Sequence, residues 1–156
     1  MSYDMELCFE LYQRPTGVVV DEIVGIVRSL TGKWFTDDMP EGARKDIPFH
    51  DVLCLRRESS VVSFIVFTSL DGAIQILLMG THPDHRGQGF GSMLMRRLFD
   101  HAKRIGFQRV VTLTVPPDVK EAYGPTVRFY ERHGFKLRAR YADLWQTGAV
   151  ELMAEI

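Results

Sequence analysis

The sequence predicts an α/β (α+β) fold with seven strands and three clear helices. Short apolar and β-branched runs alternate with segments of helical periodicity, and turn-forming residues separate them. The chain has 156 residues, which is the size of one ordinary domain and enough to bury a hydrophobic core. No repeat or low-complexity tract interrupts it. We therefore expect residues 1–156 to form a single domain.

The first third of the chain is expected to hold a strand, a helix and an irregular segment. A strand is predicted from Met5 to Tyr12, ended by Pro15. Val18 to Leu30 carries apolar residues at helical spacing and is followed by Gly32, so it predicts a helix. Trp34 to Pro48 mixes aromatic and acidic residues with glycine and proline, which predicts a short helix or an irregular, mobile segment near a binding site.

Three strands are predicted in the middle of the chain, at Val52 to Arg56, Val61 to Thr68 and Ala73 to Thr81. The connections between them are Glu58-Ser59-Ser60 and Asp71-Gly72, which are short and rich in turn-forming residues. Connections of this length join antiparallel strands. The three strands are therefore expected to form a meander.

The clearest helix is predicted from Phe90 to Ile105, where apolar residues lie opposite charged ones and Gly106 ends the pattern. The expected apolar stripe is Phe90, Leu94, Leu98, Ala102 and Ile105. A strand at Val110 to Val115, ended by Pro116-Pro117, follows. The remaining predicted elements are a helix at Pro125 to His133 before Gly134 and two strands at Phe135 to Arg140 and Ala149 to Glu155.

Composition excludes several classes of protein. Lysine plus arginine (19) nearly balance aspartate plus glutamate (20), so no broad positive face is expected and neither DNA nor RNA is an expected partner. Cys8 and Cys54 are too few for a disulfide framework and lack the spacing of a zinc site, and the five histidines show no metal-ligand spacing. We expect both cysteines to be small buried hydrophobes and predict no metal.

The N-terminal residues Met1 to Glu6 carry acids where a secretory signal carries positive charge. No apolar stretch reaches the roughly 18 residues that a membrane span requires. The sequence therefore predicts a cytoplasmic protein that is not attached to a membrane.

The most informative segment is a glycine-rich turn between the fourth strand and the following helix. Helix N-termini present unpaired N–H groups and a partial positive charge, glycines allow close approach of a diphosphate, and Arg86 adds a permanent cation. A sharp bend alone would explain the glycines but not the arginine beside them. The turn therefore predicts a site for a phosphate-bearing cofactor.

Three phosphate motifs compete for this turn. A Walker A loop requires Gly-Lys-Ser/Thr, which is absent, and the dinucleotide fingerprint requires glycine where Ser92 stands. The remaining pattern, Arg86-x-x-Gly89-x-Gly91, resembles the acyl-CoA pyrophosphate loop of the GNAT acetyltransferase superfamily. A second stretch, Thr126 to Phe135, resembles that family's Ala-x-x-Phe-Tyr-x-x-x-Gly-Phe signature, and the two motifs come in the family's order.

The resemblance implies an acetyl-CoA-dependent N-acetyltransferase with the GNAT fold. That fold is a mixed, mostly antiparallel seven-stranded sheet flanked by helices, with splayed strands 4 and 5. In the family, main-chain groups of the fourth strand pair with pantetheine and an N–H faces the thioester carbonyl, which is an oxyanion-hole arrangement. The resemblance assigns cofactor contacts to Leu78, Met79, Thr81, Arg86, Gly87, Gln88, Gly89, Phe90, Gly91 and Ser92.

The resemblance also assigns Tyr130 the role of general acid toward the departing CoA thiolate. A tyrosine hydroxyl suits this role because it remains protonated at neutral pH. Tyr130 could instead be a core residue that fills the groove between helix and sheet. The general base is open: Gln75 stands where some members have a glutamate. The candidates are His82, Asp84, His85, His133 and a water chain.

Other positions carry weaker expectations. Trp34 and Phe35 could line an acceptor pocket or the core, and Asp143-Leu144-Trp145 could form a pocket edge, a dimer contact or a turn. Tyr123 replaces an asparagine that contacts the cofactor in many members.

The expected acceptor is a primary amine of a small amine, an amino acid or a peptide. A catalytically silent acyl-CoA-binding sensor or scaffold, a cofactor-free interaction domain and a homodimer stay open.

Overall fold

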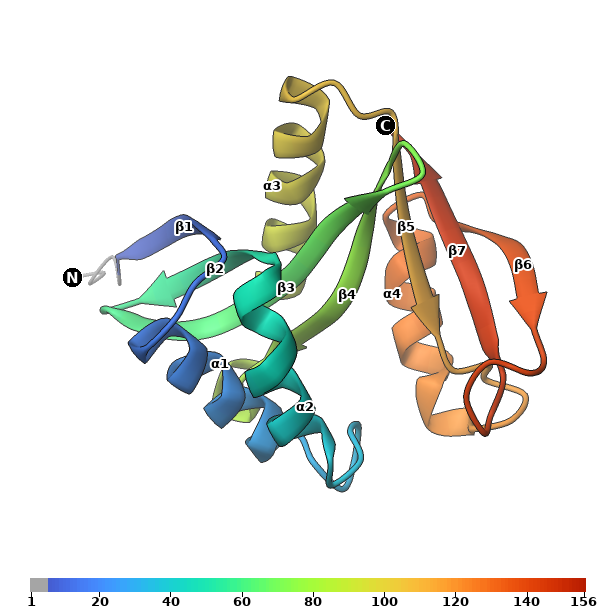
Figure 1. The fold of residues 1–156 in the computed structure, drawn as a ribbon, viewed down its shortest axis with the longest axis horizontal. Coiled ribbons are helices and arrows are strands. Elements are labelled where there is room, and N and C mark those ends of the chain that lie inside the picture. Colours follow the sequence, from blue (N-terminus) through green and yellow to red (C-terminus); the bar gives the residue numbers. More distant parts are fainter. Residues whose placement is uncertain (1–5) are drawn as a thin grey trace. The chain divides into compact units, whose positions relative to one another are not determined.

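A computed structural model describes residues 6–156 and holds the seven predicted strands together with four α-helices (Figure 1). The strands are β1 (Leu7–Gln13), β2 (Asp51–Arg57), β3 (Ser60–Leu70), β4 (Ala73–Thr81), β5 (Arg109–Thr114), β6 (Lys136–Tyr141) and β7 (Ala149–Glu155). The helices are α1 (Val18–Ser29), α2 (Met39–Asp46), α3 (Phe90–Arg104) and α4 (Gly124–Arg132), with short 3-10 helices η1 (Ile47–Phe49), η2 (Pro83–His85) and η3 (Glu121–Tyr123). Met5, the predicted start of the first strand, lies outside the described residues.

The strands form one mixed sheet in the order β1-β2-β3-β4-β5-β7-β6. The pairs β1·β2, β2·β3, β5·β7 and β6·β7 are antiparallel, whereas β4 and β5 are parallel. Within residues 6–156, the register between β4 and β5 covers Ile74↔Val110 to Ile76↔Thr112, although both strands are longer. The predicted mixed, mostly antiparallel sheet with splayed strands 4 and 5 is confirmed.

Two tight turns produce the predicted meander of β2, β3 and β4. Glu58 and Ser59 have φ of 50° and 72°, and Asp71 and Gly72 have φ of 54° and 75°. Two successive residues in the left-handed region define the type I′ turn, whose twist matches that of the strands it joins. Each hairpin therefore needs only two loop residues, and β3 already begins at Ser60.

The contacts of the chain divide it into two units, residues 6–67 with 78–98, and residues 68–77 with 99–156. In the first unit, α1 and α2 pack on β2 and β3 (Figure 1). Ile23, Val24 and Val27 of α1 are fully buried beside Phe64. The apolar spacing of the Val18 to Leu30 segment therefore predicted the buried face correctly. Its successor, the mixed Trp34 to Pro48 segment, contains the short helix α2.

In the second unit, Phe99 of α3 lies beside Phe135, which stands between α4 and β6, and the two ring centroids are 5.9 Å apart. Helix α3 ends at Arg104, and Gly106 has a φ of 98°, as expected for a glycine that ends a helix. Ile105 is 53% exposed, so its predicted place on the apolar stripe is wrong. The chain leaves the helix one residue earlier than the periodicity indicated.

The two cysteines differ from each other. Cys54 is buried on β2, and burial raises the pKa of its thiol to about 12, so it remains a neutral thiol in the core. Cys8 is exposed. The prediction that both are buried is therefore wrong for Cys8, because β1 is the edge strand of the sheet and has a solvent-facing side.

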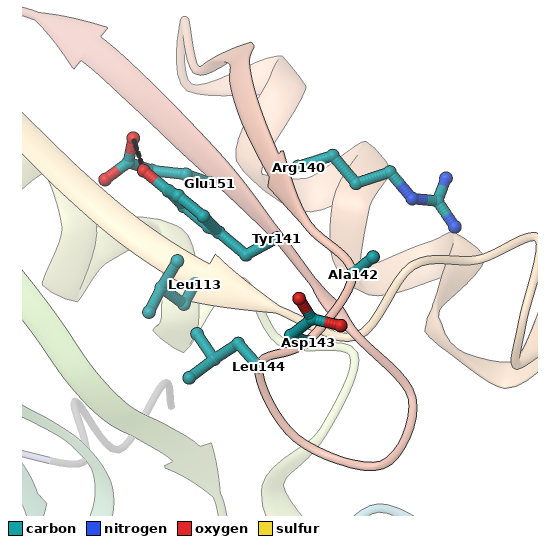
Figure 2. A pocket seen from close by; sticks show the side chains of 7 residues that line it. All are labelled: Leu113, Arg140, Tyr141, Ala142, Asp143, Leu144 and Glu151. Carbon is teal, nitrogen blue, oxygen red and sulfur yellow. Dashed lines mark hydrogen bonds between the residues drawn. The ribbon is translucent and has the colours of Figure 1, made fainter.

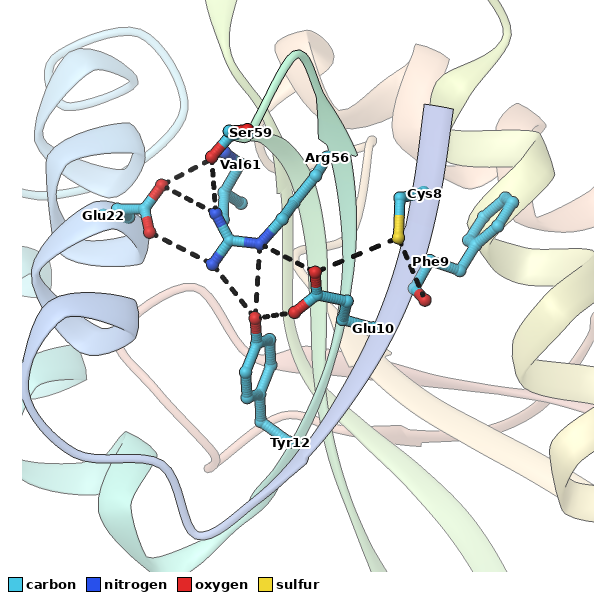
Figure 3. Close-up of polar contacts among 8 residues, drawn as sticks. All are labelled: Cys8, Phe9, Glu10, Tyr12, Glu22, Arg56, Ser59 and Val61. Carbon is cyan, nitrogen blue, oxygen red and sulfur yellow. Dashed lines mark hydrogen bonds and ion pairs between the residues drawn. The ribbon is translucent and has the colours of Figure 1, made fainter. Parts of the chain in front are cut away.

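A polar network joins β1, α1 and the β2–β3 hairpin in the first unit (Figure 3). The Arg56 guanidinium donates to both carboxylate oxygens of Glu22 at 3.3 and 3.1 Å and to the Tyr12 hydroxyl at 3.2 and 3.0 Å. It also donates to the Ser59 carbonyl at 2.8 Å and lies 3.5 Å from a carboxylate oxygen of Glu10. The Arg56 side chain is 14% exposed, so these contacts are partly shielded from water.

We expect Arg56→Met to lower the free energy of unfolding by about 1.5 to 3 kcal/mol, because Glu22 and Glu10 would lose their shared cation. Arg44→Met is the control, since Arg44 pairs with Asp21 on the surface at 2.6 Å and exposed pairs contribute less than about 1 kcal/mol. Urea unfolding followed by circular dichroism measures both. Equal losses in the two variants would contradict the structural importance of the network.

Candidate functional site

The C-terminal half of β4 is fixed to β3 by a buried serine. The Ser63 hydroxyl donates to the Gly80 carbonyl at 3.1 Å and lies 2.8 Å from the Thr81 hydroxyl oxygen. Gly80 packs closely, because a side chain there would meet Leu30 and Phe64 at 3.1 Å. Of the predicted main-chain binding residues on this strand, Leu78 also packs its side chain against the core of the first unit.

A tight loop connects β4 to α3. His82 caps the start of η2, and its Nδ1 accepts a hydrogen bond from the Asp84 N–H at 3.1 Å. Gly87 and Gly89 follow with φ of 76° and 79°, a region that favours glycine, and a Cβ at either position would meet no atom within 4 Å. Glycine is therefore favoured at both positions by the backbone conformation and not by crowding, and the space where a side chain would stand is open.

Helix α3 begins at the end of this loop. The Met93 N–H donates to the Gly89 carbonyl at 3.0 Å, so the N–H groups of the preceding helical residues have no partner inside the helix. The first turn of α3 contains no acidic residue, and the Phe90 side chain is buried, which anchors the helix start in the first unit. The arrangement is suited to binding an anion at the helix N-terminus.

Arg86 is exposed at the start of the loop, and its guanidinium carbon lies 4.8 Å from the ring centroid of Trp34. The distance is within the range of a cation–π contact. Trp34 comes from the segment between α1 and α2, so the structure brings this predicted pocket residue to the predicted phosphate loop. Phe35, its predicted partner, is partly buried and packs against the core of the first unit.

The candidates for a general base lie in two places. Asp84 and His85 belong to η2 and His82 directly precedes it, whereas His133 follows α4 in the second unit. Since Nδ1 of His82 accepts the Asp84 N–H, a proton on this ring in its neutral form is assigned to Nε2. Nδ1 of His85 is buried without a hydrogen-bond partner among the described residues. Gln75 pairs with Val111 on β5.

Arg57 is a neighbour of the loop that sequence reasoning missed. It is the last residue of β2, and its Nη1 donates to Oε1 of Gln88 at 2.9 Å. Its guanidinium carbon lies 6.0 Å from the ring centroid of Phe90. No local pattern in the sequence connects these residues, because the contact joins positions 31 residues apart.

The second sequence signature, in α4, forms a helix C-cap in the second unit. Gly134 has a φ of 89°, its N–H donates to the Glu131 carbonyl at 3.0 Å, and the Phe135 N–H donates to the Tyr130 carbonyl at 3.1 Å. These two bonds define a Schellman motif, and the Tyr130 and Phe135 rings supply its hydrophobic contact with centroids 5.1 Å apart. The Tyr-x-x-x-Gly-Phe spacing therefore has a structural reason of its own.

The Tyr130 side chain is 7% exposed, and its hydroxyl is hydrogen-bonded to the side chain of Thr112 on β5. Burial raises the pKa of Tyr130, and the Thr112 hydrogen bond offsets part of this rise. The Thr112 hydroxyl also lies 3.4 Å from the Ile76 carbonyl of β4. Tyr123, at the end of η3, is partly buried, which raises the pKa of its hydroxyl.

An open groove of about 680 Å³ lies in the second unit, at the β6–β7 hairpin (Figure 2). The Tyr141 hydroxyl donates to a Glu151 carboxylate oxygen at 3.5 Å, and Arg140 points away to form a two-bond pair with Asp118 at 3.1 and 2.9 Å. The residues that line the groove are Leu113, Arg140, Tyr141, Ala142, Asp143, Leu144 and Glu151. Asp143 and Trp145 lie in the turns that connect β6 to β7, so the structure shows the turn, one of the three roles considered for this segment. Asp143 and Leu144 also line the groove.

Within residues 6–156, no group of three or more His, Cys, Asp or Glu side chains could hold a metal ion. None of the helices in this part of the chain has both the length and the apolar character needed to cross a membrane.

The fold combines a parallel β4–β5 pair with a glycine-containing loop before α3. Residues 10–135 match the sequence model described as the acetyltransferase (GNAT) family. The chain belongs to the GNAT acetyltransferase family. No match was found among the curated proteins.

Solved structures share the fold at low sequence identity. A protein from Desulfovibrio desulfuricans assigned to the GNAT family is 17% identical, with a TM-score of 0.82 over 97% of this chain and 98% of that one. PaiA N-acetyltransferase from Thermoplasma acidophilum, solved with coenzyme A, is 12% identical, with a TM-score of 0.72 over 97% and 100% of the two chains. A GNAT family acetyltransferase from Elizabethkingia anophelis, solved with acetyl-CoA, is 12% identical, with a TM-score of 0.71 over 98% and 99%.

Proposed function

We propose that residues 1–156 form one N-acetyltransferase domain that moves an acetyl group from acetyl-CoA to a primary amine. The acceptor is a small amine, an amino acid or a peptide or protein amine. The observation that carries the proposal is the Gly87 to Gly89 turn, which leads into the acid-free N-terminus of α3 beside Arg86. Family membership and the coenzyme A and acetyl-CoA complexes of two structural relatives support it. A cytoplasmic location and a homodimer stay predictions from sequence.

The loop residues fit a diphosphate. The space above Gly87 and Gly89 is open, and the first N–H groups of α3 lack intrahelical partners. In this proposal, the main chain of Gly87 to Ser92 and the Arg86 guanidinium bind the pyrophosphate of the cosubstrate. The main chain of Leu78, Met79 and Thr81 binds pantetheine and directs an N–H at the thioester carbonyl.

In the proposed reaction, the neutral acceptor amine attacks the thioester carbon, a C–N bond forms and the C–S bond breaks. Tyr130 supplies a proton to the departing thiolate and is reprotonated from water, and the proton lost by the amine leaves through a water chain or through His82, Asp84, His85 or His133. The raised pKa of Tyr130 keeps its hydroxyl protonated at neutral pH, which a general acid requires.

We expect acetyl-CoA to stabilise the purified protein against heat. A ligand that binds only the native state adds roughly 2.7 kcal/mol at a hundredfold excess over its Kd. Differential scanning fluorimetry measures the shift in Tm. The comparison ligands are 3′-dephospho-CoA, which lacks the 3′-phosphate, and pantetheine, which lacks all the phosphates, and both are expected to stabilise the protein less. Absence of a shift at millimolar acetyl-CoA, together with absence of binding by calorimetry, would contradict the proposal.

A second candidate is a catalytically silent acyl-CoA-binding module. The observation that favours it is the Tyr130 hydroxyl, which is buried and hydrogen-bonded to Thr112 in the same way as a core tyrosine. Release of free CoA thiol, measured with a panel of amines, separates the two functions. An enzyme releases CoA with at least one amine, whereas a silent module binds acetyl-CoA and releases none above hydrolysis.

A further inference from the structure

Arg56 and Arg57 are adjacent on β2, yet their surroundings differ. Arg56 is satisfied by Glu22, Glu10 and Tyr12, as shown in Figure 3. In the part of the chain that the structure describes, Arg57 forms no ion pair with a carboxylate. Its guanidinium extends to the glycine loop, where Nη1 donates to Gln88 at 2.9 Å.

An arginine has five N–H donors in a planar fork, and within residues 6–156 the Arg57 fork forms one hydrogen bond, to Gln88. The Nε atom of Arg57 is buried and has no hydrogen-bond partner among the described residues. A buried donor without an acceptor costs free energy. This cost falls if an anion binds beside Nε.

The position of Arg57 indicates that the anion is a phosphate group. Its guanidinium carbon lies 6.0 Å from the ring centroid of Phe90, the first residue of α3, and its partner Gln88 lies between Gly87 and Gly89. The N-terminus of α3 carries a partial positive charge that favours a bound anion. A planar fork with unpaired donors beside this helix terminus matches the geometry of phosphate oxygens.

We propose that Arg57 is a second phosphate-binding arginine of the loop, which holds Gln88 and donates its remaining N–H groups to a phosphate of coenzyme A. The inference rests on the proposed function, because it requires that the loop bind this cosubstrate. The ligand chemistry is a phosphate oxygen, and it could belong to the pyrophosphate or to the 3′-phosphate. Arg57 would thus add a cation from β2 to the one that Arg86 supplies from the loop.

Isothermal titration calorimetry with CoA tests the proposal on the full chain. We expect Arg57→Gln to weaken CoA binding about 10- to 100-fold, the range for losing hydrogen bonds to a charged group, and Arg57→Lys to weaken it less because the charge remains. Gln88→Ala is expected to have a smaller effect, since it removes only the contact within the loop. Arg28→Gln, which removes an arginine from α1, is expected to bind CoA like the wild type.

Salt and a truncated ligand complete the test. Raising the salt concentration is expected to narrow the difference between wild type and Arg57→Gln, because salt screens a charge contact. A loss with CoA but not with 3′-dephospho-CoA assigns the contact to the 3′-phosphate, and an equal loss with both assigns it to the pyrophosphate. Circular dichroism and Tm confirm that the variants fold, and Arg57→Lys provides a second variant that retains the charge.

Two results would overturn the role of Arg57 and leave the proposed function intact. In the first, Arg57→Gln binds CoA within twofold of the wild type. In the second, Gln88→Ala loses as much affinity for CoA as Arg57→Gln does. In the second result Arg57 would only position Gln88. A wild type that does not bind CoA would overturn the proposed function and this inference with it. The wild-type titration therefore separates the two failures.

Discussion

Replacing Gly89 by glutamate is expected to abolish binding of acetyl-CoA while the chain still folds. Gly89 has a φ of 79° and its carbonyl accepts the Met93 N–H, so it is the residue from which α3 begins. A glutamate side chain would enter the open space above the loop, and its negative charge would lie where the pyrophosphate is proposed to bind. The carboxylate would also compensate the positive end of the helix, which is the attraction available to an anion.

The control must separate backbone strain from the effect on binding. Gly106→Glu suits this purpose, because Gly106 also has a positive φ, of 98°, and open space around its Cβ, but it follows the other end of α3. Both variants carry the cost of a side chain in the left-handed region, about 1 to 2 kcal/mol. Calorimetry with acetyl-CoA is expected to show binding by Gly106→Glu only. Unchanged affinity in a folded Gly89→Glu protein would show that the loop is misassigned.

The order of elements could be predicted from the sequence because it depends on local patterns. Turn residues such as Asp71-Gly72 and the helical spacing of Ile23, Val24 and Val27 act over a few positions. Errors occurred where local pattern and tertiary position disagree. Cys8 is a residue type that is usually buried, but it lies on an edge strand and is exposed. Ile105 continues the apolar spacing of α3, but the helix ends before it and its side chain is exposed.

The candidate site was predictable only where a motif runs continuously along the chain. The loop from Arg86 to Ser92 is such a motif, and its two left-handed glycines are present in the structure. Arg57 and Trp34 reach the same loop from segments more than 30 residues away, through a hydrogen bond to Gln88 and a ring contact with Arg86. Contacts of this kind depend on the order of the strands in the sheet and on the path of the loops, and no short sequence pattern predicts them.

The role of Tyr130 is harder to predict for a physical reason. Its signature spacing places the tyrosine and Phe135 in ring contact around Gly134, which a helix C-cap requires whether or not the hydroxyl takes part in chemistry. Its hydroxyl is bonded to Thr112, which is consistent with a core residue and also with a positioned proton donor. The sequence pattern therefore indicates the ring and not the function of the hydroxyl.

Tyr130→Phe separates these roles, because it removes the hydroxyl and keeps the ring contacts with Phe135 and Phe129. We expect single-turnover acetyl transfer to fall about 10²-fold or more while the Kd for acetyl-CoA stays within about twofold, since general-acid assistance acts only in the transition state. The free energy of unfolding is expected to fall by about 1 kcal/mol, the loss of one hydrogen bond. Thr112→Val removes the same bond from the other side while the Tyr130 hydroxyl stays in place, although it also removes the 3.4 Å bond from Thr112 to the Ile76 carbonyl.

The pH dependence supplies a second readout whose sign follows from burial. A general acid must be protonated, and burial raises the pKa of Tyr130 above its ordinary value near 10. Transfer by the wild type is therefore expected to hold through neutral and moderately alkaline pH and to decline only as the raised pKa is passed. Tyr130→Phe has no ionising hydroxyl and is expected to lack that decline. A variant that transfers acetyl within about twofold of the wild type, with the same alkaline limb, would assign Tyr130 to the core and leave water or the acceptor to protonate the thiolate.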